Sequence, residues 1–333
     1  MQHDQSHFSL RAGQLSDIPG VVALANACSQ EFTGIDEVSL GDYEQEWRDP
    51  AMNTDTNTRV AIAPDGALVG CVEVWGFPPY VGYWVWGRVL PSWRDRGVGT
   101  ALMDWAEARV GQDLGRAPEE AQVAIDTGVF SGEQPAIDLM NDRGYSAYRY
   151  SLTMERSLSD LPPVPALPDG IVLRGMRPGE ERLVYRAVDE SFQDHRGHVP
   201  SDEETNFPSW LHHATARPGY DPELWLLATE GDEIAGIAMC YPSRAGDEQH
   251  GWVGTLGVRR AWRKRGVGRA LLLGAFERLR ERGCTRVGLG VDAHSLTGAT
   301  RLYEGVGMRA VQQFIGFQKV LRPGADLRRS ALD

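Results

Sequence analysis

Hydrophobic residues in the second half of the chain follow two alternating spacings, which predict a series of strands and helices. Apolar runs at 225–229, 234–241 and 251–258, separated by turn-forming Gly and Asp, predict three consecutive strands. Further strands are predicted at 171–174, 287–291 and 313–321, and helices at 179–192 and 298–306. Three- and four-residue spacing predicts one more helix, ended by Gly283, whose buried face comprises Val267, Ala270, Leu271, Ala275 and Leu279. This order predicts a mixed α/β fold in which antiparallel strands come first.

The pattern occurs twice along the chain. Residues 89–99 read VLPSWRDRGVG and residues 258–268 read VRRAWRKRGVG, so that Gly97 and Gly266 are 169 residues apart. Gly70 and Gly236 are 166 residues apart, and Gly144 and Gly307 are 163 apart. Collinear matches at such similar offsets indicate that a whole domain has been duplicated.

The length of 333 residues fits two domains of about 150 residues each. Segment 161–170 holds four prolines, which fix φ and remove backbone donors, so it is expected to be a stiff linker. We therefore expect an N-terminal domain at 1–160, a C-terminal domain at 171–322 and a tail at 323–333.

Composition excludes several classes of protein. With 42% hydrophobic and 24% charged residues, the chain has no apolar run near the ~20 residues that a membrane span requires. No signal peptide is recognisable at residues 1–7, so we expect a cytoplasmic enzyme. The net charge of −12 disfavours nucleic acid as a partner. The four cysteines lack metal-ligand spacing, so no metal is expected.

The repeated loop carries the chemistry that can be identified from sequence. A strand ends, glycines allow a tight turn, and the next helix begins with unpaired amides that attract phosphate. Segment 259–269 holds six Lys or Arg residues in an otherwise acidic chain. This combination favours a polyanionic cofactor such as coenzyme A. The nucleotide motifs G-x-x-x-x-G-K-[ST] and G-x-G-x-x-G are absent from the sequence.

At this loop the chain resembles the GNAT superfamily of N-acetyltransferases, whose acyl-CoA loop reads V-x-x-x-x-R-x-x-G-x-G. Segment 292–308, DAHSLTGATRLYEGVGM, is similar to the second GNAT signature, N-x-x-A-x-x-L-Y-x-x-x-G-F. The resemblance implies two tandem domains, each a mixed, mostly antiparallel sheet that splays between its fourth and fifth strands. It also implies acetyl-CoA as cosubstrate in the cleft.

The resemblance implies roles for individual residues. Tyr303 would be the acid that protonates the CoA thiolate, and backbone groups of Leu256 and Val258 would hold the pantetheine. Arg263 through Arg269 would hold the pyrophosphate. The expected cofactor-binding residues of the second copy are Leu256, Gly257, Val258, Arg263, Lys264, Arg265, Gly266, Val267, Gly268, Arg269 and Ser295. Those of the first copy are Val89, Arg94, Gly97, Val98, Gly99 and Thr100.

The two copies depart from the family pattern to different degrees. In the second copy we take Ser295, next to the position of the signature Asn, as its counterpart, so an amide contact to the cofactor is lost. In the first copy, Leu139-Met140 replaces Leu302-Tyr303, and the loop has only two arginines, opposed by Asp95. We therefore expect a degenerate first domain that binds CoA weakly or serves structure, and a catalytic second domain.

A general base is harder to assign, because a carboxylate, an imidazole or a relayed water could deprotonate the attacking amine. The sequence offers two groups of candidates. One precedes the strand at 251–258 and comprises Asp247, Glu248 and His250; the other is the segment Glu190 to His195. Beside Asp194, His195 could titrate near neutral pH, although a solvated loop histidine is the preferred interpretation.

The predicted function is therefore transfer of acetyl from CoA to the primary amine of a small molecule. Among two-domain members, the architecture is similar to that of mycothiol synthases, which implies a cysteinyl pseudodisaccharide acceptor as one alternative. Against this, Trp252 occupies the position where we align the acidic residue of those enzymes. The other alternative is a non-catalytic acyl-CoA sensor. We expect a monomer or a homodimer.

Overall fold

The chain forms two compact units that are not consecutive halves. The computed structural model describes residues 8–49, 52–193, 202–216, 219–293 and 298–328. The first unit combines residues 1–150 with 314–327, and the second unit is built from residues 151–313 together with the chain end from 328. We describe each unit separately.

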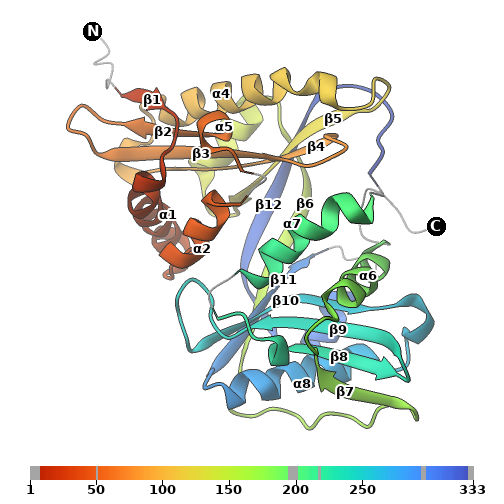
Figure 1. The fold of residues 1–333 in the computed structure, drawn as a ribbon. Coiled ribbons are helices and arrows are strands. Elements are labelled where there is room, and N and C mark those ends of the chain that lie inside the picture. Colours follow the sequence, from red (N-terminus) through yellow and green to blue (C-terminus); the bar gives the residue numbers. More distant parts are fainter. Residues whose placement is uncertain (1–7, 50–51, 194–201, 217–218, 294–297, 329–333) are drawn as a thin grey trace. The chain divides into compact units, whose positions relative to one another are not determined.

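The first unit is a sheet in the order β1-β2-β3-β4-β5-β12, in which only the β4–β5 pair is parallel (Figure 1). Its strands are β1 (Ser9–Arg11), β2 (Thr58–Ile62), β3 (Leu68–Gly76), β4 (Gly82–Val89), β5 (Val123–Phe130) and, from Phe314 on, β12 (Arg309–Arg322). Its helices are α1 (Ile18–Thr33), α2 (Leu40–Trp47), α3 (Thr54–Asn57), α4 (Val98–Gln112) and α5 (Gln134–Asp142).

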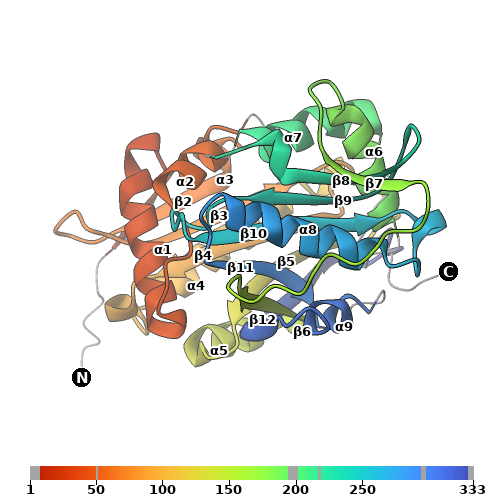
Figure 2. The same cartoon turned by 90° about the horizontal axis from the view of Figure 1, so that it is seen from below.

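The second unit repeats this order as β7-β8-β9-β10-β11-β6, with a parallel β10–β11 pair. Its strands are β7 (Ile171–Gly175), β8 (Trp225–Glu230), β9 (Glu233–Tyr241), β10 (His250–Val258), β11 (Arg286–Asp292) and, from Ser151 on, β6 (Ser146–Ser157). Its helices are α6 (Glu181–Phe192), α7 (Glu203–Thr215), α8 (Val267–Glu281) and α9 (Ala299–Glu304). Helix α8 covers one face of the sheet, and α6 and α7 cover the other (Figures 1 and 2).

The closing strands are exchanged between the halves of the sequence. Strand β12, from the end of the chain, pairs with β5 in the first unit, whereas β6, from the first half, pairs with β11 in the second. The boundaries of the two spatial units therefore differ from those of the expected domains at 1–160 and 171–322. The expected boundaries describe the repeat in the sequence and remain a prediction. Hydrophobic alternation identifies a strand and its buried face but does not specify its partner.

The predicted elements of the second half are confirmed with shifts of a few residues at their ends. All five residues predicted on the buried face of the helix at 267–279 are at most 1% exposed in α8. Strand β9 is buried on both faces, because α8 packs against one side and α6 against the other. Helix α7 was not predicted; it begins at the N-cap Asp202, whose carboxylate accepts a hydrogen bond from the Thr205 amide, and it contains Pro208.

Equivalent neighbours confirm the duplication. A Cβ added to Gly99 would lie 3.1 Å from Leu139 and 3.7 Å from Val89. One added to Gly268 would lie 3.5 Å from Leu302 and from Val258, at the matching positions. In both units, therefore, the loop glycine faces the same strand and the same later helix.

The strand exchange predicts where a mutation in β12 acts. Phe317 is 2% exposed and lies opposite Thr127 of β5. Phe317→Ala should destabilise the first unit by about 3–5 kcal/mol, because a buried aromatic ring is replaced by a cavity. Hydrogen exchange should then lose protection in β4 and β5. The exposed Val320→Ala on the same strand is the control, and loss of protection in β10 and β11 instead would contradict the exchange.

Candidate active site in the second unit

The sheet of the second unit opens between β10 and β11. Parallel pairing runs from His250↔Arg286 to Val253↔Leu289 and then stops, although β10 continues to Val258 and β11 to Asp292. A register shift between Val253 and Thr255 places a bulge at this point, which bends the strand. Beyond the bulge, the edge of β10 that faces β11 has no ladder pair in the described chain. Its backbone groups can therefore pair with an amide-bearing ligand.

The turn after β10 presents the amides at the start of α8. Lys264 and Gly266 adopt positive φ angles of 61° and 84°, and the helix begins at Val267. No side chain caps this end of the 15-residue helix. Unpaired amides and the positive end of the helix dipole make such a turn an anion site. The expected phosphate-binding loop thus has a suitable backbone.

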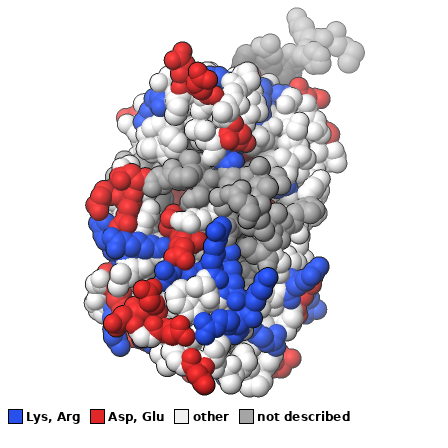
Figure 3. Space-filling model, turned by 90° about the vertical axis from the view of Figure 1, so that its right-hand side faces the viewer, with Lys and Arg blue, Asp and Glu red and all other residues white. Residues whose placement is uncertain are grey.

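Most cations of segment 259–269 have partners within the protein. Arg259 contacts Glu190 and Glu233, each at 2.6 Å, and Arg265 lies 3.3 Å from Glu230. Figure 3 shows one face of the molecule on which Lys and Arg side chains gather beside Asp and Glu. The positive charge of this segment is therefore partly compensated.

Individual side chains of the turn differ in how they are placed. Arg263 donates hydrogen bonds to the carbonyl oxygens of Val258 and Ser191, so it points inward and holds the turn to β10 and α6. This differs from the expected role of Arg263 on the pyrophosphate. Lys264 is exposed at the turn. Arg269 donates a hydrogen bond of 2.7 Å to the Gly305 carbonyl oxygen and so ties α8 to the end of α9.

Tyr303 lies on α9 and is 7% exposed. Its ring belongs to the same hydrophobic cluster as Val267, at the start of α8, and Leu289, at the last paired position of β11. Burial raises the pKa of Tyr303 to about 12, so the phenol is protonated at neutral pH. The structure thus places a neutral phenol on the α8 side of the opening.

The expected general bases fall in different places. His195 and the expected cofactor residue Ser295 lie outside the described residues. Glu248 is exposed and precedes β10, at the end of the strand opposite to the opening. Two other candidates are engaged in ion pairs, Glu190 with Arg259 and Asp247 with Arg286 at 2.5 Å. Because Glu248 lies at the end of β10 far from the opening, its position does not favour it as the base.

One charged residue near the last paired positions of β10 and β11 was not predicted. Glu155 reaches the second unit through β6, opposite Gly288 of β11. It was missed because β6 belongs to the first half of the sequence, and sequence analysis assigned it to the first domain. An acidic residue in the middle of a strand is the one signal that could have drawn attention to it.

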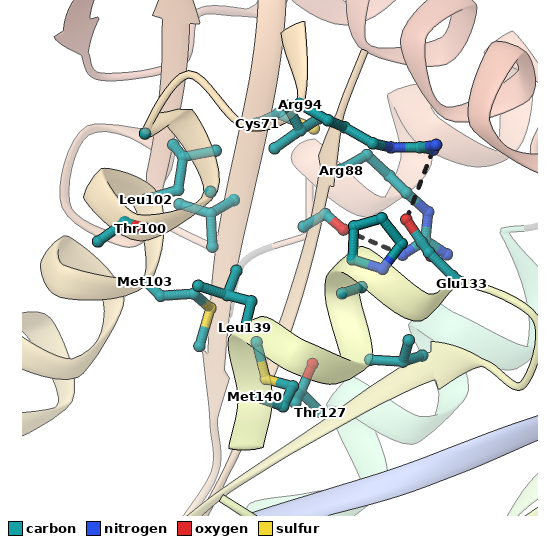
Figure 4. A pocket seen from close by; sticks show the side chains of 18 of the residues that line it. Cys71, Arg88, Arg94, Thr100, Leu102, Met103, Thr127, Glu133, Leu139 and Met140 are labelled. Carbon is teal, nitrogen blue, oxygen red and sulfur yellow. Dashed lines mark hydrogen bonds and ion pairs between the residues drawn. The ribbon is translucent and has the colours of Figure 1, made fainter. Parts of the chain in front are cut away.

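The first unit contains the equivalent opening as a pocket. Parallel pairing of β4 and β5 stops after Val85↔Thr127, and a pocket of about 190 Å³ lies beyond it (Figure 4). Leu102, Met103, Leu139 and Met140 form an apolar part of its lining. Of the expected cofactor residues in this copy, Val89, Arg94, Gly97, Gly99 and Thr100 line it.

The charges in this pocket differ from those of the second unit. Arg94 contacts Glu31 at 2.8 Å and Glu133 at 3.6 Å, and Figure 4 shows Arg94 and Arg88 pointing toward Glu133. Burial raises the pKa of Glu133. Asp95, with φ of 58°, takes the place that Lys264 holds in the second copy. The first turn thus has the same shape but carries a negative charge where an anion would bind.

Two further features are absent from the described part of the chain. His, Cys, Asp and Glu residues do not gather there into a group able to hold a metal ion. Among the described helices, none has the length and hydrophobicity needed to cross a membrane.

Comparison with known proteins agrees with this geometry. The profile of the "Acetyltransferase (GNAT) family" matches residues 21–145 and again 184–308. The chain belongs to the GNAT family. It is an acyltransferase built from two tandem GNAT domains, and the predicted fold class is confirmed.

Similar proteins include other tandem GNAT chains. A mycothiol acetyltransferase of Acidothermus cellulolyticus is 34% identical over 66% of each chain. One from Geodermatophilus obscurus is 30% identical over 86% of this chain and 90% of its own. The crystal structure of a GCN5-related N-acetyltransferase from Sphaerobacter thermophilus is 34% identical, with a TM-score of 0.80 over 98% of this chain and 99% of its own. A tandem GNAT protein from the clavulanic acid pathway, 17% identical with a TM-score of 0.74, shares the fold.

Proposed function

We propose that the protein transfers an acetyl group from acetyl-CoA to a primary amine of a small molecule, and that the reaction takes place in the second unit. The observation that carries the proposal is the opening between β10 and β11, which ends at a glycine turn and a helix N-terminus. The second unit also has Tyr303 and Lys264, where the first has Met140 and Asp95.

The residues of the second unit fit acetyl-CoA. The edge of β10 at Leu256, Gly257 and Val258 has no ladder pair with β11 and would bind the pantetheine amides, as a neighbouring strand would, with the Val258 carbonyl oxygen already held by Arg263. Amides from Gly266 to Arg269, with Lys264 and Arg265, would bind the pyrophosphate. In this arrangement Arg263 is a positioning residue, because its guanidinium holds the turn. Acetyl-CoA supplies an activated acyl group as a thioester.

Tyr303 would supply the proton that the departing sulfur needs. Because burial keeps the phenol neutral, the hydroxyl can donate to a developing thiolate throughout the neutral pH range. The Tyr303 ring is buried in the hydrophobic core of the second unit, which fixes its orientation, so that donation of the proton requires little reorganisation. Met140, at the equivalent position of the first unit, cannot perform this step, which supports the second unit as the site of the reaction.

The relatives favour a specific acceptor. Several are named mycothiol acetyltransferases, and one of them aligns with 86% of this chain. We propose the amine of a cysteinyl pseudodisaccharide, the acceptor implied by this resemblance, as the first candidate. Trp252 stands where we align the acidic residue of those enzymes, so this chain must deprotonate the amine by another route.

The first test follows CoA release with a thiol-reactive dye while the protein and acetyl-CoA are screened against amines, including cysteinyl glycosides. We expect turnover that Gly266→Glu abolishes and that the matched Gly97→Glu leaves within about threefold. At position 266 a glutamate would repel the phosphates of acetyl-CoA and would strain the backbone, which has a positive φ there. Loss only in Gly97→Glu would move the site to the first unit. Tight acetyl-CoA binding without turnover would support a sensor.

The role of Tyr303 predicts a selective loss. Tyr303→Phe should lower kcat by about 10- to 100-fold and leave the dissociation constant of acetyl-CoA unchanged, because only the hydroxyl is removed. Stopped-flow or steady-state assays measure both quantities. Tyr220→Phe, elsewhere in the second unit, is the matched control and should retain full activity. An unchanged kcat in Tyr303→Phe would assign the proton to another donor.

A further inference from the structure

The face of the second sheet opposite α8 carries polar groups beside the opening. Side chains alternate along a strand, so Val287 and Leu289 of β11 point into the α8 core while Gly288 and Gly290 are on the other face. Their partners on β6 are Glu155 and Thr153, since residues that pair across a ladder point to the same side. This face is the one covered by α6 and α7.

Four residues from three segments meet on this face. A carboxylate oxygen of Glu155 lies 3.3 Å from His250 Nε2 and 3.5 Å from a guanidinium nitrogen of Arg244. The Arg244 guanidinium stacks on the Trp252 ring, 4.1 Å from its centre. His250 is 2% exposed, and burial, with Arg286 and Arg244, lowers its pKa to about 4. The imidazole is therefore neutral at pH 7, and its Nε2 makes no hydrogen bond within the described chain.

Two glycines leave room next to this group. A Cβ on Gly288 would lie 2.6 Å from the Trp252 ring, so the ring covers that position closely. On Gly290, one residue pair beyond the end of the ladder, a Cβ would meet no described atom within 4 Å. The space above Gly290 therefore lies beside the opening. Gly290 is opposite Thr153 of β6, and Glu155 is two residues further along the same strand, on the same face.

Glu155 and Tyr303 are on opposite sides of the opening. Tyr303 belongs to the α8-side core, and Glu155 lies on the α6 and α7 side. A thioester held between β10 and β11 would then have a proton donor on one face and a carboxylate on the other. An amine that attacks from the Glu155 face displaces sulfur toward the Tyr303 face.

We infer that Glu155 binds the ammonium group of the acceptor and takes its proton, and is thus the general base of the second unit. This inference rests on the proposed function. In the step, an ammonium proton passes to the Glu155 carboxylate, and the freed nitrogen forms a bond to the acetyl carbonyl carbon. The carbon–sulfur bond breaks, and the sulfur takes a proton from Tyr303. The nitrogen loses its second proton to solvent, and solvent returns a proton to the Tyr303 phenolate and takes the one held by Glu155.

The surroundings of Glu155 suit this role. The titratable groups around it are His250 and Arg244, which contact it, and the Asp247–Arg286 pair, whose members both influence the titration of His250. Arg244 places one positive charge 3.5 Å from the carboxylate. A neutral His250 adds no second positive charge that would repel the incoming ammonium.

The inference also makes the second site depend on the first half of the sequence. Glu155 lies on β6, which precedes the proline-rich segment at 161–170. A site that takes its acid from α9 and its base from β6 is incomplete without the exchanged strand. The exchange is then a requirement of the chemistry as well as of folding.

The test is Glu155→Gln in the full-length protein, assayed with acetyl-CoA and the best amine found for the wild type. At pH 7, kcat/KM for the amine should fall at least 100-fold, while the dissociation constant of acetyl-CoA stays within about twofold. In the wild type, kcat/KM should be flat between the pKa of the base and that of the amine. In the variant it should rise about tenfold per pH unit up to the pKa of the amine, because only free amine reacts.

Two further variants complete the design. Glu155→Asp keeps the charge and should keep the flat profile with a lower kcat, and the exposed Glu281→Gln on α8 should behave as the wild type. A flat profile in Glu155→Gln with kcat/KM within threefold of the wild type overturns the inference. So does an equal loss of acetyl-CoA affinity, or a sloped profile in Glu155→Asp. A wild type that acetylates no amine overturns the proposed function instead.

Discussion

The end of strand pairing between β10 and β11 is the feature on which the rest of the second unit depends. Four residue pairs hold the strands together as far as Val253 and Leu289, and the bulge that follows turns β10 away. If β10 and β11 stayed paired along their whole length, the amides of β10 would be used in hydrogen bonds to β11. Because the pairing stops, β10 offers them to a ligand at a place bordered by a helix N-terminus, a buried phenol and the Glu155 group.

The duplicated copies separate shape from chemistry. Both have the opening, the bent turn with two positive φ angles and the tightly packed loop glycine. They differ in side chains: the second unit has Lys264 and Tyr303 where the first has Asp95 and Met140. Arg263 donates hydrogen bonds to backbone carbonyl oxygens, whereas its counterpart Arg94 contacts carboxylates. The backbone that forms the cleft has thus persisted in the first unit, whereas the charges that favour a phosphate and the phenol have not.

Much of this could be predicted from sequence, because the decisive signals are local. The repeat, the glycine turn and the helical stripe of α8 each lie within a short segment, and each is found as predicted. The exchange of β6 and β12 could not be predicted, since alternation in 146–157 is satisfied equally in either sheet. The same limit hid Glu155. A count of cations in 259–269 likewise could not show that the Arg263 guanidinium points toward the Val258 carbonyl oxygen.

Hydrogen exchange of the intact protein with and without acetyl-CoA tests the central claim most directly, because it shows which unit binds the cosubstrate. The account predicts slower exchange at the amides of 256–258 and 265–269, with much smaller changes at 87–89 and 96–100. Equal protection of both loops would show that the charges of the first turn do not prevent binding. Protection confined to the first loop would contradict the assignment of the active site.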